Sequence, residues 1–249
     1  MITKRYHFEI IDSTNKKAKE YAQEGALHGT LITADAQQTG IGRRGRSWSS
    51  EKDTGIYMSM LLRPKIETEK ASMLTLVAAL AVEKAMEELL VCQPMIKWPN
   101  DIVLNKKKVC GILTEMALKG TEIDYVVIGI GINVNNKTFP EEILTTASSL
   151  SLELGVEIDR ELLISEVWKK FDVYYQQFLE TKDFMFLKEA YESVLVNKEE
   201  NVKVLDPLGE YMGIAKGITN TGELIVDTDG ELRYVSGGEV SVRGIYGYV

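Results

Sequence analysis

The sequence has few of the residues that cross-link small folds or bind metals. Its 249 residues include two cysteines, Cys92 and Cys110, and two histidines, His7 and His28. Two cysteines are too few for a disulfide framework. Both lie in apolar stretches, which predicts buried thiols in a reducing cytoplasm. With two histidines and no ligand spacing typical of zinc, the sequence predicts no zinc site, and it assigns no residue as a metal ligand.

A membrane-spanning run and an excess of basic charge are also missing. The longest nearly apolar run, residues 73–82, is too short to span a bilayer and is flanked by charged residues. Residues 1–10 contain no apolar signal-peptide region. The formal net charge is −8 and the isoelectric point is about 5.1, which disfavours bulk attraction to nucleic acid or to an anionic membrane. We therefore expect a cytoplasmic protein with no membrane or DNA partner.

The composition predicts an ordinary hydrophobic core. Hydrophobic residues make up 45% of the chain and charged residues 27%, as in globular proteins with one large domain or a medium and a small one. Periodicity and turn residues predict a mixture of helices and strands before residue 198. The helices are expected at residues 13–25, 68–90 and 159–197, the strands at 29–37, 55–64, 95–104, 108–118 and 124–134, and a hairpin turn at 105–107.

The character of the sequence changes after Asn197. Short stretches rich in strand-forming residues follow, and turn signals such as Asp206-Pro207 separate them. This pattern predicts a small SH3-like β-barrel. We therefore expect two domains, residues 1–198 and residues 199–249.

The most distinctive stretch is residues 37–48, which read QQTGIGRRGRSW. Its core, GIGRRG at residues 40–45, matches the G-x-G-x-x-G pattern, and with Arg46 in the lysine position it nearly matches a P-loop. Both phosphate-binding motifs require a helix directly after the loop, because the helix N-terminus supplies the amide donors. A polar connection and then the strand at residues 55–64 are expected here, so we reject both motifs.

Three other interpretations of this loop differ in how they explain its charge. An arginine–glycine nucleic-acid patch fits poorly with a chain of net charge −8. A solvated surface turn does not explain the combination of three glycines with Arg43, Arg44 and Arg46. Glycine loses much conformational entropy on ordering, and the three cations repel one another unless an anion lies between them. A mobile loop that becomes ordered around a polyanion explains both features, and we favour it.

Further short motifs lie elsewhere in the chain. They are DSTN at residues 12–15, IKWPND at 96–101, KVCGIL-x-E at 108–115, GIGIN at 129–133 and GGEVSVR at 237–243. Each one alone has an ordinary structural explanation. Lys97 fits an exposed lysine, Ser13 fits a helix cap, and Gly129 and Gly131 fit tight packing in a sheet.

Taken together and in this order, the motifs resemble those of the biotin protein ligases, which are also called biotin–acetyl-CoA-carboxylase ligases. The resemblance covers residues 12–243, nearly the whole chain. It implies an α/β (α+β) catalytic domain with a mixed sheet, of a type shared with lipoate ligases, and an SH3-like C-terminal domain. It also implies ATP-dependent activation of biotin as biotinyl-5′-AMP, followed by transfer of biotin to a lysine of a carrier domain.

The resemblance assigns roles to particular residues. It implies that Arg43 and Lys97 are catalytic, with Lys97 between the biotin carboxylate and the α-phosphate of MgATP. For biotin it implies contacts from Ser13, Thr14, Asn15, Gln37, Gly40, Ile41, Gly42, Arg43, Lys97 and Gly111. For the nucleotide it implies contacts from Arg43, Arg46, Trp48, Lys97, Asn133 and Arg243, the last from the small domain. Arginine suits such a site because it is always charged and can bind phosphate or carboxylate with two parallel hydrogen bonds.

Two departures from the family pattern lead to expectations of their own. Ile41 stands where some members carry a further arginine, which predicts a weaker grip on biotin or on the adenylate. Eleven residues precede Asp12, whereas some bacterial members carry an N-terminal winged helix-turn-helix there. We therefore expect a ligase without a DNA-binding function.

The resemblance also implies a protein partner. The acceptor is expected to be a biotin carboxyl carrier domain of acetyl-CoA carboxylase or pyruvate carboxylase, docked by pairing with an edge strand. The same edge serves a homodimer in related ligases. Other classes of function are a lipoate–protein ligase, a non-catalytic biotin or nucleotide sensor, and a nucleic-acid-binding protein. The GRRGR loop and the KWPND motif argue against the first, and the presence of both Arg43 and Lys97 argues against the second.

Overall fold

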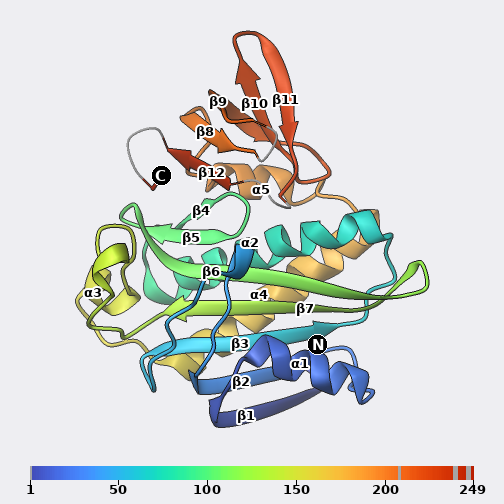
Figure 1. The fold of residues 1–249 in the computed structure, drawn as a ribbon, viewed down its shortest axis with the longest axis vertical. Helices are drawn as coiled ribbons and strands as arrows, with labels where there is room; N and C mark the ends of the chain where they lie inside the picture. The colour runs from blue at the N-terminus through green and yellow to red at the C-terminus, as the bar shows by residue number, and fades with distance from the viewer. Residues whose placement is uncertain (1, 207–208, 238–240, 245–247) are drawn as a thin grey trace.

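A seven-stranded sheet forms the centre of the computed structural model, which describes residues 2–206, 209–237, 241–244 and 248–249 (Figure 1). Its order is β1-β2-β3-β7-β6-β5-β4. β1 runs parallel to β2, and the other neighbours are antiparallel, so the predicted mixed sheet is confirmed. The strands are β1 (Lys4–Ile11), β2 (Thr30–Gln37), β3 (Gly55–Leu62), β4 (Met95–Lys97), β5 (Asp101–Leu104), β6 (Lys107–Lys119) and β7 (Glu122–Asn133).

Helices cover the two faces of this sheet unequally. α2 (Met73–Leu90) and α4 (Arg160–Thr181) pack on one face in the main hydrophobic core, and α1 (Thr14–Gln23) packs on the other face (Figure 1). No helix among the described residues combines the length and the apolar character that a membrane span requires. The shorter helices are η1 (Arg43–Gly45), η2 (Thr68–Ser72), η3 (Glu141–Ile143), α3 (Leu150–Leu154) and α5 (Lys188–Ser193).

Strand β3, which lies between β2 and β7, separates the core from a polar region. Met60 belongs to the main core with α2, whereas Leu61 belongs to the smaller apolar cluster under α1. Ser59 lies on the same side of the sheet as Leu61, because successive side chains of a strand point to opposite faces. Its hydroxyl lies 2.6 Å from Asn15 Oδ1 on α1. The strand predicted at residues 55–64 is confirmed as β3, and one of its two faces carries polar contacts.

Residues 95–104, predicted as one strand, form a hairpin instead. β4 pairs antiparallel with β5, and residues 98–100 make the turn, which includes a cis peptide bond between Trp98 and Pro99. Proline has no backbone N–H to donate to a strand ladder, so the strand does not continue through Pro99. The turn places Lys97 and Asp101 side by side on paired strands.

The helix predicted at residues 159–197 is interrupted. α4 ends before Lys182, which adopts a left-handed φ of 55°, and α5 begins only at Lys188. Phe184 and Leu187 between the two helices are buried, so the apolar spacing continues where the backbone is not helical. Residues 68–72 of the predicted helix at 68–90 likewise form a 3-10 turn before α2.

The edge strand β1 is not predicted by the sequence pattern. Several of its residues are exposed, including Ile10 at 56%, so hydrophobic alternation along the strand is weak. Tyr6 packs edge-on against Tyr21 of α1, with a ring-centroid distance of 4.7 Å. An edge strand has one neighbouring strand and little apolar surface to bury, which explains the weak signal.

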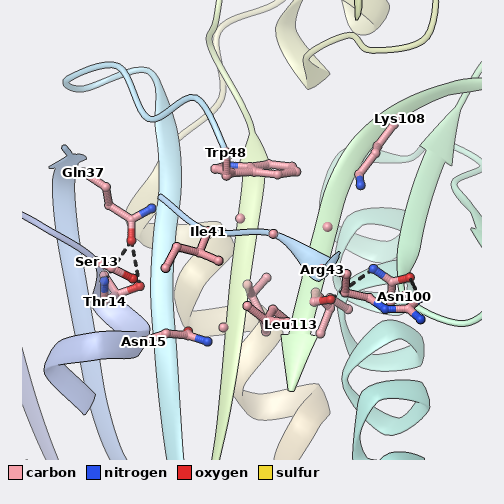
Figure 2. A pocket seen from close by; sticks show the side chains of 16 residues that line it. Ser13, Thr14, Asn15, Gln37, Ile41, Arg43, Trp48, Asn100, Lys108 and Leu113 are labelled. Carbon is pink, nitrogen blue, oxygen red and sulfur yellow. Dashed lines mark hydrogen bonds between the residues drawn. The ribbon is translucent and has the colours of Figure 1, made fainter. Parts of the chain in front are cut away.

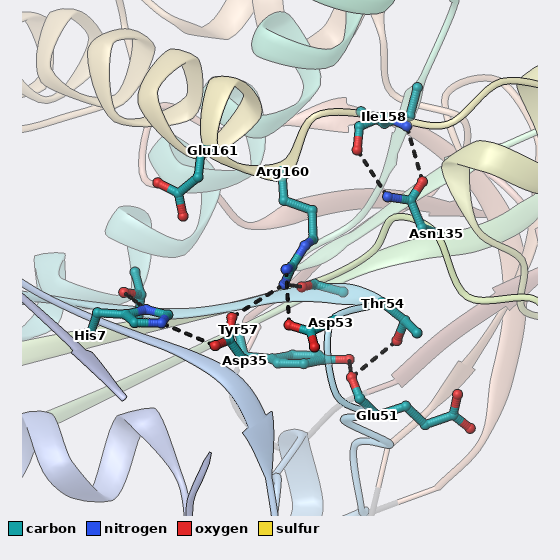
Figure 3. A network of polar contacts seen from close by, with 12 residues as sticks. His7, Asp35, Glu51, Asp53, Thr54, Tyr57, Asn135, Ile158, Arg160 and Glu161 are labelled. Carbon is teal, nitrogen blue, oxygen red and sulfur yellow. Dashed lines mark hydrogen bonds and ion pairs between the residues drawn. The ribbon is translucent and has the colours of Figure 1, made fainter. Parts of the chain in front are cut away.

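A polar network ties this edge of the sheet to the start of α4 (Figure 3). The guanidinium of Arg160 lies 3.2 Å from Asp53 Oδ1 and 3.6 Å from Asp35 Oδ1, and it donates to the carbonyl oxygen of Gly55 at 3.2 Å. Nε2 of His7 lies 3.1 Å from Asp35 Oδ2. Because Asp53 and Gly55 follow the glycine-rich loop in sequence, the network fixes the end of the segment that leads from that loop into β3.

The cysteines are not equally buried. Cys110 is fully buried, but Cys92 is half-buried beyond the end of α2, so the prediction of two buried thiols is wrong for Cys92. Burial raises the pKa of each thiol above its ordinary value.

The C-terminal residues form an antiparallel sheet of the order β11-β10-β9-β8-β12. This arrangement agrees with the predicted small all-β unit. This sheet contacts the first sheet through the β4–β5 turn, where the indole N–H of Trp98 donates to the Gly222 carbonyl at 3.0 Å. The predicted domain boundary near residue 198 stays a prediction. The strands are β8 (Asn201–Leu205), β9 (Tyr211–Ile218), β10 (Leu224–Thr228), β11 (Glu231–Val235) and β12 (Ser241–Gly244).

The buried carboxyl group of Glu83 in α2 makes stability depend on pH. Burial, together with the nearby charge of Glu87, raises the pKa of Glu83 from 4.5 to about 7. A raised acid pKa destabilises the fold progressively as pH rises from 4.5 through 7. We expect Glu83→Gln to raise the free energy of unfolding at pH 8 by on the order of 1–2 kcal/mol, and by much less at pH 5. Denaturant unfolding at the two pH values measures this.

The matched control is Glu180→Gln, which makes the same chemical change at an exposed position of α4. Its replacement should change stability little at either pH, because an exposed carboxylate contributes little. An equal effect of Glu83→Gln at pH 5 and pH 8 would contradict the proposed titration.

Candidate functional site

Three glycines form the floor of the candidate site and leave it free of side-chain atoms. Gly111 on β6 and Gly131 on β7 are register partners, and Gly129 lies two residues before Gly131. A Cβ atom on Gly131 would lie 2.6 Å from the indole of Trp48, and one on Gly129 would lie 2.0 Å from Asn15 Oδ1. Side-chain carbons do not approach other atoms so closely. Glycine at these positions therefore leaves the space that Trp48 and Asn15 occupy.

The glycine-rich loop folds back over this floor. Ile41 and Ser47 form an isolated antiparallel bridge, and residues 43–45 make a 3-10 turn between them. Gly40 lies at the base of the loop, where a Cβ atom would meet the carbonyl oxygen of Trp48 at 2.4 Å. A strand, not a helix, follows the loop, which agrees with the rejection of a P-loop.

Arg43 joins the loop to two other parts of the molecule. Its Nη1 donates to Asn100 Oδ1 at 2.6 Å in the β4–β5 turn, and its Nη2 donates to the carbonyl oxygen of Gly237 in the C-terminal segment. Burial lowers the pKa of Arg43, although the charge of Asp101 opposes this effect. Arg43 therefore fastens the loop across the site.

A first pocket lies between this loop and the sheet (Figure 2). Its polar end is formed by the start of α1 and the end of β2. Gln37 Oε1 accepts a hydrogen bond from the backbone N–H of Thr14 at 2.8 Å and lies 3.1 Å from Thr14 Oγ1. Its walls are apolar and its roof is the ring of Trp48. The lining residues are Ser13, Thr14, Asn15, Gln37, Ile41, Gly42, Arg43, Trp48, Asn100, Lys108, Gly111, Ile112, Leu113, Gly129, Ile130 and Gly131.

A second pocket continues from the first beneath the loop. It extends over the end of β7 toward the segment that precedes α3, and its lining includes Arg44, Arg46, Asn133, Phe139 and Tyr248. The two pockets share Gly42, Arg43, Trp48, Asn100 and Lys108. Two cations, Arg43 and Lys108, therefore lie where the pockets meet.

Lys108 is held at this junction by Asp101. Its Nζ lies 2.6 Å from Asp101 Oδ1, and the hydroxyl of Tyr248 donates to Asp101 Oδ2. Burial alone would raise the pKa of Asp101, but the charge and hydrogen bond of Lys108 outweigh it, so this pKa lies below its ordinary value. The carboxylate therefore stays charged and orients the Lys108 ammonium group.

Lys97 lies behind this pair, at the end of β4. It is 5% exposed, and its Nζ lies 3.4 Å from the centroid of the Tyr248 ring. Burial lowers the pKa of Lys97 to about 8, and the charge of Lys108 also lowers it, although Asp101 opposes the shift. Burial and the Asp101 carboxylate raise the pKa of Tyr248 well above its ordinary value. The Tyr248 ring covers Lys97 on the side of the second pocket.

The structure brings most of the predicted site residues together. Gly40, Lys97 and Arg243 line neither pocket: Gly40 lies at the loop base, Lys97 lies beneath Tyr248, and Arg243 is exposed on β12. The predicted residues in the first pocket are Ser13, Thr14, Asn15, Gln37, Ile41, Gly42, Arg43, Trp48 and Gly111. Those in the second pocket are Gly42, Arg43, Arg46, Trp48 and Asn133.

Sequence reasoning missed Lys108, Asn100 and Tyr248 as site residues. Lys108 and Asn100 belong to the KVCGIL and KWPND motifs, but several lysines stand in a row at residues 106–108, and periodicity does not tell which one faces the site. Tyr248 lies outside every motif, so its place could not be found from the sequence.

Comparison with known sequences agrees with this arrangement. Residues 7–133 match the biotin/lipoate A/B protein ligase family, and residues 199–243 match the biotin protein ligase C terminal domain. The chain therefore belongs to the biotin/lipoate A/B protein ligase family.

Its relatives and structural neighbours include biotin ligases. The chain is 38% identical to the bifunctional ligase/repressor BirA of Bacillus subtilis over 95% of its own length and 73% of that protein. It is 31% identical to the biotin–acetyl-CoA-carboxylase ligase of Paracoccus denitrificans over 94% of this chain and 98% of that one. A structure of biotin protein ligase from Aquifex aeolicus in complex with biotin and ATP matches 97% of this chain and 99% of that chain, with a TM-score of 0.86 and 34% identity.

Proposed function

We propose that this protein is an ATP-dependent biotin protein ligase. The biotin carboxylate attacks the α-phosphate of MgATP to form biotinyl-5′-AMP and pyrophosphate. A lysine amine of a biotin carboxyl carrier domain then attacks the mixed anhydride, and AMP leaves. The observation that carries the proposal is the pair of pockets that meet at Arg43 and Lys108. Cations are needed at such a junction, because a carboxylate and a polyphosphate repel each other as they approach.

The first pocket suits biotin. Its polar end, at Ser13, Thr14, Asn15 and Gln37, matches the ureido ring, and its apolar walls match the rest of the bicycle and the alkyl chain. The alkyl chain would then run beneath Ile41 and Gly42 toward the junction with the second pocket. Gly40 and Gly111 act by leaving space for Trp48 and for Lys108.

The second pocket suits the nucleotide. Arg46 and Asn133 line it, and the indole N–H of Trp48 is buried with no hydrogen-bond partner among the described residues, which leaves it free to donate to a ligand. Arg43 and Lys108 would face the α-phosphate. Arg243, which is exposed on β12, would add positive charge on the side of Lys97 and Tyr248.

Gly131 provides a test of the Trp48 roof. Replacing Gly131 by alanine inserts a Cβ atom where the indole lies 2.6 Å away, so Trp48 must move from its place over both pockets. We expect affinity for biotin and for ATP to fall by roughly tenfold each, in line with the loss of one well-placed aromatic contact. Calorimetric titration measures both affinities, and circular dichroism checks that the variant is folded. Unchanged affinity for both ligands would contradict the role of Trp48 as a roof.

Lys97 is tested separately because Tyr248 covers it. The family resemblance implies that Lys97 acts on the α-phosphate, and in that role Lys97→Ala should slow adenylation by roughly 10²–10³-fold. Single-turnover formation of biotinyl-5′-AMP measures this rate. A loss under about fivefold would mean that Lys97 supports the structure and does not act on the substrates.

The acceptor would dock at the open edge of β6. β5 pairs with β6 only as far as Gly111, and Met116 and Leu118 farther along β6 are 46% and 50% exposed. Among the described residues, no strand pairs with residues 113–118 on that side. A strand of the carrier domain, or the same strand of a second copy, would add to this edge. The negative net charge continues to argue against DNA as a partner.

Exchange of labelled pyrophosphate into ATP tests the proposed function. We expect exchange that depends on biotin and is not supported by lipoate. Exchange with lipoate alone would indicate a lipoate ligase. Biotin binding without any exchange would indicate a sensor and would contradict the catalytic roles of Arg43, Lys97 and Lys108.

A further inference from the structure

The side-chain amide of Asn15 is fixed from both sides. Its Nδ2 donates to Glu115 Oε2 at 2.8 Å, and its Oδ1 lies 2.6 Å from the hydroxyl of Ser59. Asn15 is 6% exposed, Ser59 is fully buried, and the floor beneath Asn15 is Gly129. None of these contacts is local, since Asn15 and Glu115 are 100 residues apart in sequence.

Glu115 determines which way this amide points. A carboxylate accepts hydrogen bonds and does not donate them, so it must face the NH₂ group of Asn15 and not its oxygen. Nζ of Lys19, one turn farther along α1, lies 2.6 Å from Glu115 Oε1 and holds the carboxylate in place. Both Glu115 and Lys19 are partly exposed, at 35% and 38%, so they act on the pocket from its rim.

The hydroxyl groups next to Asn15 reinforce this orientation. Ser59 Oγ lies 2.8 Å from Thr14 Oγ1, which in turn lies 3.1 Å from Gln37 Oε1. Three oxygen–oxygen contacts therefore share two hydroxyl protons. Gln37 Oε1 already accepts a hydrogen bond from the Thr14 backbone N–H and does not need the Thr14 hydroxyl proton. The Thr14 proton can therefore go to Ser59 Oγ, and the Ser59 proton goes to its shortest contact, Asn15 Oδ1. The oxygen of Asn15 is thereby occupied, and the amide has no reason to rotate.

The consequence is a defined donor at the deep end of the first pocket. One N–H of Asn15 goes to Glu115, and the other is left for a ligand. Figure 2 shows the nitrogen of Asn15 directed toward the interior of the pocket. By strand alternation, Glu115 lies on the same face of β6 as Gly111 and Leu113. Those two residues line the first pocket, so Glu115 lies just beyond the wall that the bicyclic ring of biotin would contact.

We propose that Glu115, held by Lys19, is a positioning residue that presents the Asn15 NH₂ group to the carbonyl oxygen of a cyclic urea. The inference rests on the proposed function and names the feature that selects biotin within it. A ring that carries only sulfur, such as that of lipoate, has no acceptor for this N–H. A ring whose carbonyl is replaced by an imine, as in protonated 2-iminobiotin, places donor against donor.

Glu115→Gln tests the orientation with almost no change in shape. Glutamine offers both a carbonyl and an NH₂ group, so Asn15 can turn over. We expect affinity for biotin to fall by roughly tenfold to hundredfold, the scale of a buried acceptor that is left without its donor. The preference for biotin over 2-iminobiotin should fall by at least about fivefold, while the KM for ATP and kcat at saturating biotin should change less than about twofold. Titration calorimetry and pyrophosphate exchange measure these quantities.

Glu122→Gln is the matched control, because it makes the same chemical change at an exposed position on the neighbouring strand β7. Lys19→Met, which removes only the support of Glu115, should reduce affinity for biotin less than Glu115→Gln does. Ser59→Ala releases the other end of the amide and should lower the biotin to 2-iminobiotin preference in the same direction. A general loosening of α1 would instead weaken the binding of biotin and of 2-iminobiotin equally, and the ratio of their affinities would not change.

The outcomes separate this inference from the function on which it rests. Biotin binding by Glu115→Gln that equals wild type, or a loss with an unchanged biotin to 2-iminobiotin ratio, would overturn the positioning role while leaving the ligase function intact. Absence of biotin binding by the wild-type protein would overturn both.

Discussion

Replacing Lys108 by methionine is expected to slow biotin-dependent pyrophosphate exchange by roughly 10²–10³-fold, the usual effect of removing one preorganised electrostatic group. Lys108 lines both pockets, and its ammonium group is oriented by the half-buried Asp101 carboxylate at 2.6 Å. A charge held in this way stabilises the transition state without reorganising, whereas a mobile surface lysine would have to be ordered first. Methionine keeps the length of the side chain and removes the charge.

The neighbouring Lys107 provides a matched control. It lies on the same strand, is 44% exposed and is 3.9 Å from Glu153, away from both pockets. Lys107→Met should therefore leave exchange within about twofold of wild type, because a weak exposed ion pair contributes little. Lys108→Met leaves the half-buried Asp101 carboxylate without this cation, so thermal unfolding must accompany the assay. Lys108→Arg keeps the charge and should retain more activity than Lys108→Met. Equal activity of Lys108→Met and wild type would assign the junction to Arg43 and Lys97 instead.

Replacing Arg43 by glycine is expected to release the reactive intermediate. Arg43 ties the loop to Asn100 and to the carbonyl oxygen of Gly237, so its removal opens the loop on two sides. Biotinyl-5′-AMP is a mixed anhydride that reacts with water and with any amine, and a closed loop keeps both away from it. We expect Arg43→Gly still to form the adenylate, to lose it to solvent at least about tenfold faster, and to biotinylate lysines of bystander proteins.

Two measurements define this effect. Chromatography after a chase with unlabelled biotin follows loss of the intermediate, and a streptavidin blot of an added protein without a carrier domain reports bystander labelling. Lys52→Gly is the matched control, since Lys52 is an exposed cation on the segment between the loop and β3 and lines neither pocket. If Arg43→Gly forms the adenylate yet labels only its carrier, the loop does not retain the intermediate.

Ile41 also acts within this loop. The family resemblance predicted a weaker grip on the adenylate because some members carry arginine at this position. Ile41 is 54% exposed, lines the first pocket and pairs with Ser47 in the bridge that shapes the loop. An apolar side chain here suits the alkyl part of biotin. Whether it also weakens retention stays a prediction, which the chase experiment measures in Ile41→Arg.

The sequence by itself was sufficient for features encoded in short contiguous stretches. Strand β3 and helix α1 follow from local periodicity and from residues typical of helix ends, although the Ser13 side chain makes no capping hydrogen bond. The loop at residues 40–48 follows from glycine and arginine spacing, because these properties depend on neighbours along the chain. The order of the motifs also identified the family. Local patterns failed where tertiary packing overrides them: at Pro99, which turns a predicted strand into a hairpin, and at Phe184 and Leu187, which are buried without being helical.

Only the tertiary structure decided which cations lie where the two pockets meet and what orients the polar end of the first pocket. The pairing of β5 with β6 brings Lys108 to Asp101, and the packing of α1 on the sheet brings Asn15 to Glu115. The latter two residues are 100 positions apart in the chain. A contact between distant residues depends on strand register, on turn geometry and on which face of a strand points to the site. A one-residue change of register would reverse that face, and hydrophobic periodicity alone does not specify the register of polar side chains.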